Sequence, residues 1–354
     1  MKKTFKPFDM RKSTLLLATL AACAALSCTR EALPEIPAGE GTLLLSVDPG
    51  FALTRATPDL TEQAWETRIR KVDILVFDSN GQLNLYYPAG TNLTGISLSL
   101  SSGPKEIWAV INGPDLSNIV RVADLKATAI ALTDNTTGSS GTFVMAGSST
   151  CDITPAVTTP CSITVNRFAA RVALTKIAVQ LPPAYTGISL KNIMLTNVVA
   201  NQTLDGTAAP ATWYNKMGRT ASGKIIGSST SNKADAAALT FKSLAQTVSN
   251  NSQANLGGPI QFYGFANPTT TDNKTGGTFV AERTRLVVTA DIGGKTYYYP
   301  VSIAPLERNK AYEVALTITG LGSEDPDVIP EKGTSGITVT INPWGPGSVI
   351  EESI

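Results

Sequence analysis

The chain has 354 residues, of which 42% are hydrophobic and 16% are charged, and its formal net charge is +1. An average domain carries about 25% charged residues, so this composition is typical of a β-rich exported protein. The low net charge offers no basic surface for nucleic acid, and the absence of histidine excludes Ser-His-Asp, Cys-His and histidine-based zinc chemistry. We therefore expect no enzymatic activity, no metal and no cofactor.

The first 27 residues have the features of an export signal. A basic start is followed by an apolar run over residues 15–26, which is too short for a membrane span of about 20 residues. Two cysteines end this segment as in a bacterial lipobox, Cys23 and Cys28. We assign lipidation to Cys28, because the sequence becomes polar directly after it, and Cys23 is the alternative. An ordinary cleaved signal is the plainer interpretation.

Residues 28–40 are rich in proline and are expected to form a tether. The next segment, residues 41–48, alternates in polarity and predicts a strand whose inner face carries Leu43, Leu45 and Val47. Residues 51–56 lose this alternation and are expected to be an exposed connection. Arg55, followed by Ala56, lies in this connection between small residues, where a protease could reach it. Arg30, Arg68 and Arg70 are rival sites, and a solvated surface arginine is the plainer interpretation.

Further strands are predicted over residues 71–77 and 82–87, joined by a turn at 78–81. Residues 95–101 and 106–112 are expected to form the next hairpin, residues 115–127 to hold a short helix, and residues 143–147 to be a short edge strand. Cys151 and Cys161 follow. Either they form a disulfide or they are two free buried thiols, and two cysteines alone do not decide between these.

Residues 162–181 are the stretch around which the chain is organised. Their apolar positions change parity twice, and each change means that the buried face of a strand switches sides. Such a stretch is either bulged or passes from one β layer to another. We interpret it as the hinge between two β domains.

The second half continues with short strands and turns. Strands are predicted over residues 188–199, 260–265 and 310–319, and a hairpin over 285–292 and 295–303, whereas residues 201–258 are expected to be one long polar loop. The last strand, residues 336–341, places Ile337, Val339 and Ile341 on one face, and Trp344 follows. The tyrosines at 297–299 fit packing on a half-buried strand better than a sugar-binding surface.

Several motifs, taken in order, resemble one family, the fimbrillins, which are the lipoprotein subunits of type V fimbriae on Gram-negative anaerobes. The resemblance rests on the lipobox, the proline-rich tether and a series of short segments: Val72–Phe77, Trp108–Gly113, Phe143–Gly147, Arg167–Val172, Phe262–Asn267, Glu307–Tyr312 and Trp344.

This resemblance implies two transthyretin-like Greek-key β-sandwich domains in tandem, with long surface loops and little helix. The N-terminal domain would cover residues 41–165, with residues 41–55 removable, and the C-terminal domain would cover 166–354. It also implies a precursor anchored by lipid in the outer membrane and cut at the cell surface by an arginine-specific protease, for which we expect the site Arg55-Ala56.

By the same resemblance, subunits would polymerise with copies of themselves or related subunits through an exchanged strand. Residues 336–354 are the expected donor, with Ile337, Val339, Ile341 and Trp344 entering the groove that Leu43, Leu45 and Val47 vacate. The plainer interpretation makes residues 336–341 the last strand of their own domain. The alternatives for function are an uncleaved anchor or tip subunit that adheres to host or bacterial surfaces, and a surface glycan-binding lipoprotein.

Overall fold

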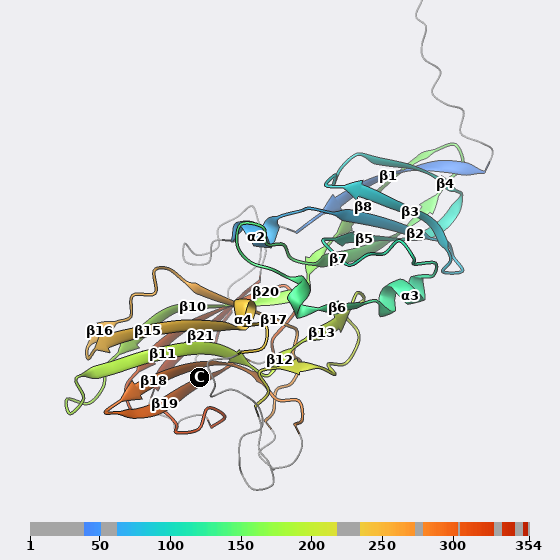
Figure 1. Ribbon diagram of the computed structural model, residues 1–354. Helices are drawn as coiled ribbons and strands as arrows, with labels where there is room; N and C mark the ends of the chain where they lie inside the picture. The colour runs from blue at the N-terminus through green and yellow to red at the C-terminus, as the bar shows by residue number, and fades with distance from the viewer. Residues whose placement is uncertain are drawn as a thin grey trace, which may run out of the picture.

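The chain folds into two β-rich lobes that lie end to end (Figure 1). The computed structural model describes residues 39–50, 62–217, 234–272, 279–303, 305–328, 335–343 and 350–352. Strands dominate both lobes, and the helices in these ranges are short, namely α2 (Ala64–Thr67), α3 (Val122–Ala127), α4 (Ala237–Thr240) and the 3-10 helix η2 (Leu132–Asp134). The expected all-β fold class is confirmed.

The N-terminal lobe is built from two sheets. The first has the strand order β4-β1-β8, from Ile96–Ser101, Glu40–Asp48 and Thr158–Thr164. The second has the order β3-β2-β5-β7-β9, from Leu83–Gly90, Val72–Phe77, Gly103–Ile111, Met145–Ile153 and Asn166–Arg167. Every residue of β2 is buried, whereas β4 alternates between buried and exposed residues. The inner strand is therefore covered on both faces, and β4 has one face in water.

The C-terminal lobe also contains two sheets. The larger has the order β14-β12-β17-β10-β20-β21-β22, from Trp213–Tyr214, Val198–Val199, Ile260–Phe265, Ala169–Val179, Lys310–Ile318, Ser335–Pro343 and Ile350–Glu352, and β16 (Ser252–Gln253) pairs with β10. The smaller has the order β15-β11-β18-β19, from Phe241–Ser249, Gly187–Thr196, Thr284–Ile292 and Lys295–Ile303. The predicted hairpin around residues 293–294 is confirmed as β18 and β19.

The stretch 162–181 connects the lobes as expected. The chain leaves β8, contributes β9 to the second N-terminal sheet and enters β10 of the C-terminal lobe. The pairing of β10 with β20 shifts register between Leu174 and Lys176, so a bulge is present as well. A second link is a two-stranded sheet of β6 (Ala129–Ala131) and β13 (Asn201–Thr203), which lies where the lobes meet (Figure 1).

Local predictions failed where the tertiary structure decides pairing. The expected hairpin of residues 95–101 and 106–112 is wrong, because β4 pairs with β1 whereas β5 pairs with β2 and β7. The strand expected at 143–147 is not an edge, since β7 runs between β5 and β9. The helix expected over 115–127 begins only at Val122. The long loop expected over 201–258 contains β13, β14, α4, β15 and β16.

No helix in the described ranges is both long and apolar enough to cross a membrane.

Candidate functional site

The first strand, β1, lies in the middle of its sheet. It pairs antiparallel with β4, Leu43 opposite Leu98, and parallel with β8, Leu45 opposite Cys161. Within the described residues, β4 and β8 have no other ladder partner. Removing β1 would therefore leave two unpaired strand edges facing each other across a groove.

The inner face of β1 fills this groove completely. Leu43 and Leu45 are fully buried and Val47 is 3% exposed, while Leu44 between them is 40% exposed. This is the alternation that the sequence predicted for residues 41–48. Burying three such side chains contributes roughly 5–8 kcal/mol before the cost of ordering the strand. The three side chains therefore define three apolar pockets that any replacement strand must fill.

The groove is cross-linked at one side. Cys151 on β7 and Cys161 on β8 form a disulfide with an S–S distance of 2.03 Å. Of the two interpretations left open by the sequence, the structure contains the disulfide. Since β8 has only β1 as a ladder partner in the described residues, this bond ties β8 to the second sheet independently of β1.

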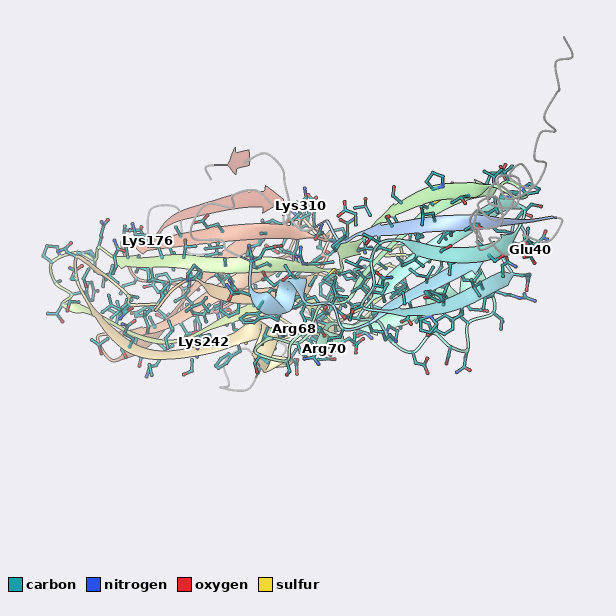
Figure 2. All side chains as sticks on the ribbon, turned by 90° about the horizontal axis from the view of Figure 1, so that it is seen from above. Glu40, Arg68, Arg70, Lys176, Lys242 and Lys310 are labelled. Atoms are coloured by element: carbon teal, nitrogen blue, oxygen red, sulfur yellow. A yellow bond between two sulfur atoms is a disulfide. The ribbon has the colours of Figure 1, made fainter. Side chains whose placement is uncertain are left out.

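Several predicted site residues lie outside the described residues, namely Cys23, Cys28, Arg55, Ala56 and Trp344. The expected cleavage site at Arg55 falls between two described segments. The first ends at Gly50, two residues after β1, and the next begins at Glu62. Figure 2 places Glu40, at the start of β1, at the far end of the N-terminal lobe, and Arg68 and Arg70 near the other lobe.

The predicted donor residues lie in β21, which is part of the C-terminal lobe. Ile337 lies opposite Leu316, Val339 opposite Val314 and Ile341 opposite Tyr312 in an antiparallel ladder with β20. In this subunit the segment is thus paired within its own chain. Its donation to a neighbouring subunit stays a prediction.

The two lobes are joined by a buried ion pair. Glu66 of α2 is fully buried, and its Oε2 accepts a hydrogen bond of 2.8 Å from Nη1 of Arg171 on β10, a side chain that is 2% exposed. The Tyr263 hydroxyl donates to Glu66 Oε1 at 2.7 Å. Burial raises the pKa of the Glu66 carboxyl, and the nearby Arg171 guanidinium opposes this shift.

Two further arginines hold the same junction. Arg167 donates from Nη2 to Glu62 Oε1 at 2.7 Å and from Nε to the Glu66 carbonyl at 2.9 Å. Arg308 donates to the carbonyls of Arg167 and Asn166 and to that of Ala146 on β7 in the N-terminal lobe. Its guanidinium also lies 3.6 Å from the Phe168 ring centroid, and burial lowers its pKa to about 10. Their role at the junction was not predicted from the sequence, because their partners are distant along the chain.

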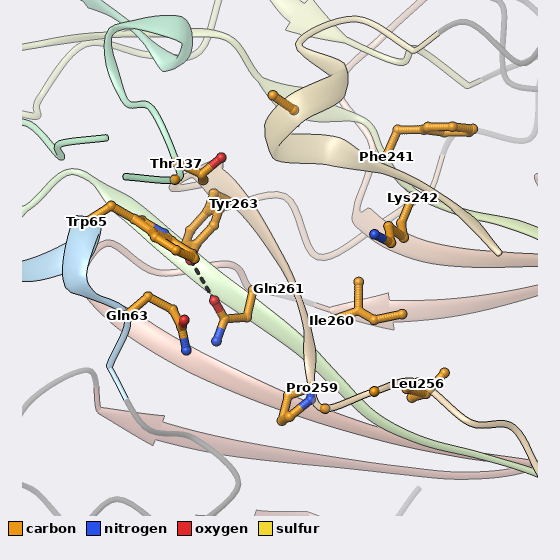
Figure 3. Close-up of a pocket in the computed structure, with 14 residues that line it drawn as sticks. Gln63, Trp65, Thr137, Phe241, Lys242, Leu256, Pro259, Ile260, Gln261 and Tyr263 are labelled. Carbon is orange, nitrogen blue, oxygen red and sulfur yellow. Dashed lines mark hydrogen bonds between the residues drawn. The ribbon is translucent and has the colours of Figure 1, made fainter. Parts of the chain in front are cut away.

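A hollow of about 420 Å³ lies beside this junction. Trp65 and Tyr263 lie together on one wall, with Gln63 and Gln261 close by (Figure 3), and the Trp65 indole donates to the Tyr263 hydroxyl at 3.0 Å. In contrast, Tyr297 and Tyr299 are buried, as expected for packing. Trp65 and Phe241, both half-buried, border this hollow, whereas of residues 297–299 only Tyr298 is half-buried.

In the part of the chain that the structure describes, no group of three or more cysteine, aspartate or glutamate side chains is arranged to hold a metal ion.

Comparison with known proteins connects the chain to fimbriae. No protein family model matches the sequence. The major fimbrium subunit FimC of Porphyromonas gingivalis is 27% identical over 217 residues, which cover 57% of this chain and 46% of FimC. The chain thus spans about half the length of the curated relative that it matches.

Solved structures share the fold over nearly the whole chain. A fimbrilin (fimA) of Porphyromonas gingivalis superposes with a TM-score of 0.62 at 15% identity, covering 88% of this chain and 99% of the other. The tip fimbrial protein Mfa3 of the same organism superposes with a TM-score of 0.53 at 15% identity, covering 86% of this chain and 100% of the other. The chain therefore has the fimbrilin fold and is similar in sequence to a fimbrial subunit, which confirms the resemblance seen in its motifs.

Proposed function

We propose that this protein is a structural subunit of a cell-surface fimbria and that β1 is the strand exchanged when subunits join. The observation that carries the proposal is the position of β1, which is the shared partner of β4 and β8 and buries its entire inner face. A groove with unpaired backbone on both sides and three apolar pockets accepts a strand from another chain. The similarity to a major fimbrium subunit supports this role.

Release of β1 requires a cut between β1 and α2, and we assign it to the bond after Arg55. Arg68 and Arg70 are weaker candidates, because the Arg68 guanidinium donates to the carbonyls of Gly138 and Gly141 and the Arg70 backbone amide donates to a side chain. A cut there would also separate Glu66 from the chain that follows. A cut after Arg55 keeps the junction between the lobes attached to the mature subunit.

The precursor is proposed to be lipidated on Cys28, anchored in the outer membrane and cut at the cell surface by an arginine-specific protease. The strand that then enters the groove is proposed to come from the C-terminal segment of a neighbouring copy or a related fimbrial subunit. Fibres built in this way would support adhesion to host or bacterial surfaces. The role is structural, and no catalysis is proposed.

The test is to treat the purified full chain with an arginine-specific protease and to follow its N-terminus and its size. We expect a mature protein that begins at Ala56 and forms polymers visible by electron microscopy. Arg55→Ala should block both steps, whereas the matched variant Arg70→Ala should be cut and polymerise like the natural chain.

Fibres that retain residues 41–48 would contradict the proposal and favour the anchor or tip subunit, which is not cut. A monomer that is cut but never polymerises, and binds an oligosaccharide, would favour the glycan-binding alternative.

A further inference from the structure

The inner face of β1 begins with a glycine that no other residue can replace without movement of its surroundings. Gly41 is buried and has the same parity as the three apolar residues, so the inner face of the strand follows the pattern Gly-x-Leu-x-Leu-x-Val. A Cβ atom at Gly41 would overlap the carbonyl oxygen of Thr154 and would lie 2.8 Å from Cγ2 of Ile153. The limit at this position is space and not backbone conformation.

The obstacle is the turn between β7 and β8, residues 154–157. This turn is bonded to the strand on both sides of the glycine, since Ala156 N donates to the Glu40 carbonyl at 2.7 Å and Thr42 N donates to the Val157 carbonyl at 3.0 Å. The two hydrogen bonds hold the turn against β1, so the Thr154 carbonyl cannot withdraw without breaking them.

Two features keep this turn in place. Its base is cross-linked by the disulfide between Cys151 and Cys161, which joins the two strands that the turn connects. Ile153, the second obstacle, is itself 1% exposed and packs in the core, so its side chain has no free space to enter. The turn is a fixed wall at one end of the groove.

We propose that this wall selects the strand that fills the groove. The occupant must carry the pattern Gly-x-Φ-x-Φ-x-Φ, where Φ is aliphatic, and the glycine sets its register against the three pockets. The inference rests on the strand exchange proposed above and names the kind of partner that fits: a strand of another subunit with glycine two residues before its first inward apolar residue.

The strand β21 of an identical copy does not carry this glycine. If Ile337, Val339 and Ile341 filled the three pockets in the direction of β1, Ser335 would occupy the position of Gly41. In the opposite direction Pro343 would occupy it. Either residue brings a Cβ atom against the wall, so in this register the natural β21 binds less tightly than a donor strand with glycine at this position.

The test uses the full chain with a specific protease site introduced within residues 51–61. The chain is cut, unfolded in denaturant and refolded with an excess of labelled peptide 39–50, and the labelled fraction is measured after gel filtration. The natural peptide and the Leu44→Ala peptide, which changes an outward side chain, should both be taken up. The Gly41→Ala peptide should compete about tenfold less well or worse. A peptide of residues 333–343 should gain uptake by a similar factor on Ser335→Gly.

The outcomes are distinct. Equal uptake of the natural and Gly41→Ala peptides would overturn the inference about the glycine but would not contradict strand exchange. Failure of every peptide, including natural β1, would overturn strand exchange itself and the inference with it. A second measurement is independent of exchange: in the intact, uncut chain, Gly41→Ala should lower the denaturant midpoint more than Leu44→Ala, and the reverse order would also overturn the inference.

Discussion

Replacing Arg171 by methionine tests whether the buried ion pair holds the two lobes together. Methionine keeps most of the unbranched apolar stem and removes the guanidinium that donates to Glu66 Oε2 at 2.8 Å. Glu66 is fully buried, so the variant leaves a carboxylate in the interior with the Tyr263 hydroxyl and the backbone amide of Gln63 as its remaining donors.

The expected loss in the free energy of unfolding is large because a buried charge is left without its counterion. Breaking such a pair typically costs about 3–5 kcal/mol, whereas a surface pair contributes about 0–1 kcal/mol. The matched control is Lys191→Met, since Lys191 pairs with Asp291 at 2.7 Å but its side chain is 48% exposed. The double variant Glu66→Gln with Arg171→Met should recover part of the loss, because position 66 then carries no carboxylate that lacks its Arg171 counterion.

The loss should also depend on pH. Burial raises the pKa of Glu66, and removing Arg171 removes the main opposing influence. A carboxyl whose pKa is raised on folding favours the native state most when it is protonated, and this contribution is lost as the pH rises through the folded-state pKa. The stability deficit of Arg171→Met relative to the natural chain should therefore shrink as the pH falls from about 8 to about 5.

The assay is scanning calorimetry with denaturant unfolding at each pH. We expect the variant to lose cooperativity between the lobes, which appears as two separated transitions. Equal and small effects of Arg171→Met and Lys191→Met, or a deficit that grows toward low pH, would refute the reasoning.

Three further predictions concern separate sites. Replacing Cys151 and Cys161 together by serine should lower the free energy of unfolding by about 2–3 kcal/mol, and reductant should destabilise only the natural chain. Burial would raise the pKa of the Asp272 carboxyl, but pairing with Arg283 and Arg285 lowers it below 3.8. The stability that this carboxylate contributes is therefore present above pH 3.8 and is lost in acid. Asp272→Asn should make the free energy of unfolding less dependent on pH in this acid range. Cys28→Ala should release unlipidated protein from membranes, and release by Cys23→Ala instead would move the lipid to Cys23.

Short-range patterns were sufficient to identify most strands. The alternation of Leu43, Leu45 and Val47 predicted both β1 and its buried face, because successive side chains of a strand point to opposite sides whatever sheet it joins. The hairpin of β18 and β19 was equally local, since a turn at residues 293–294 brings adjacent strands together. The parity changes in residues 162–181 likewise indicated the passage between the lobes.

Partner choice could not be read from the chain. The short link between β4 and β5 looks like a hairpin, yet these strands join different sheets, because pairing depends on which apolar faces the whole lobe can bury. Arg171 appears in the sequence as one charge in an apolar strand, and only the fold brings it to Glu66, 105 positions away.

The same holds for the wall at Gly41, which arises from a turn more than a hundred residues later in the chain. Local side-chain order was enough to identify the strands and their apolar faces, because both depend on residues that are close along the chain. The ladder partners of each strand, the buried ion pairs and the close contact at Gly41 became visible only in the folded chain, because they depend on contacts between residues that are distant along the sequence.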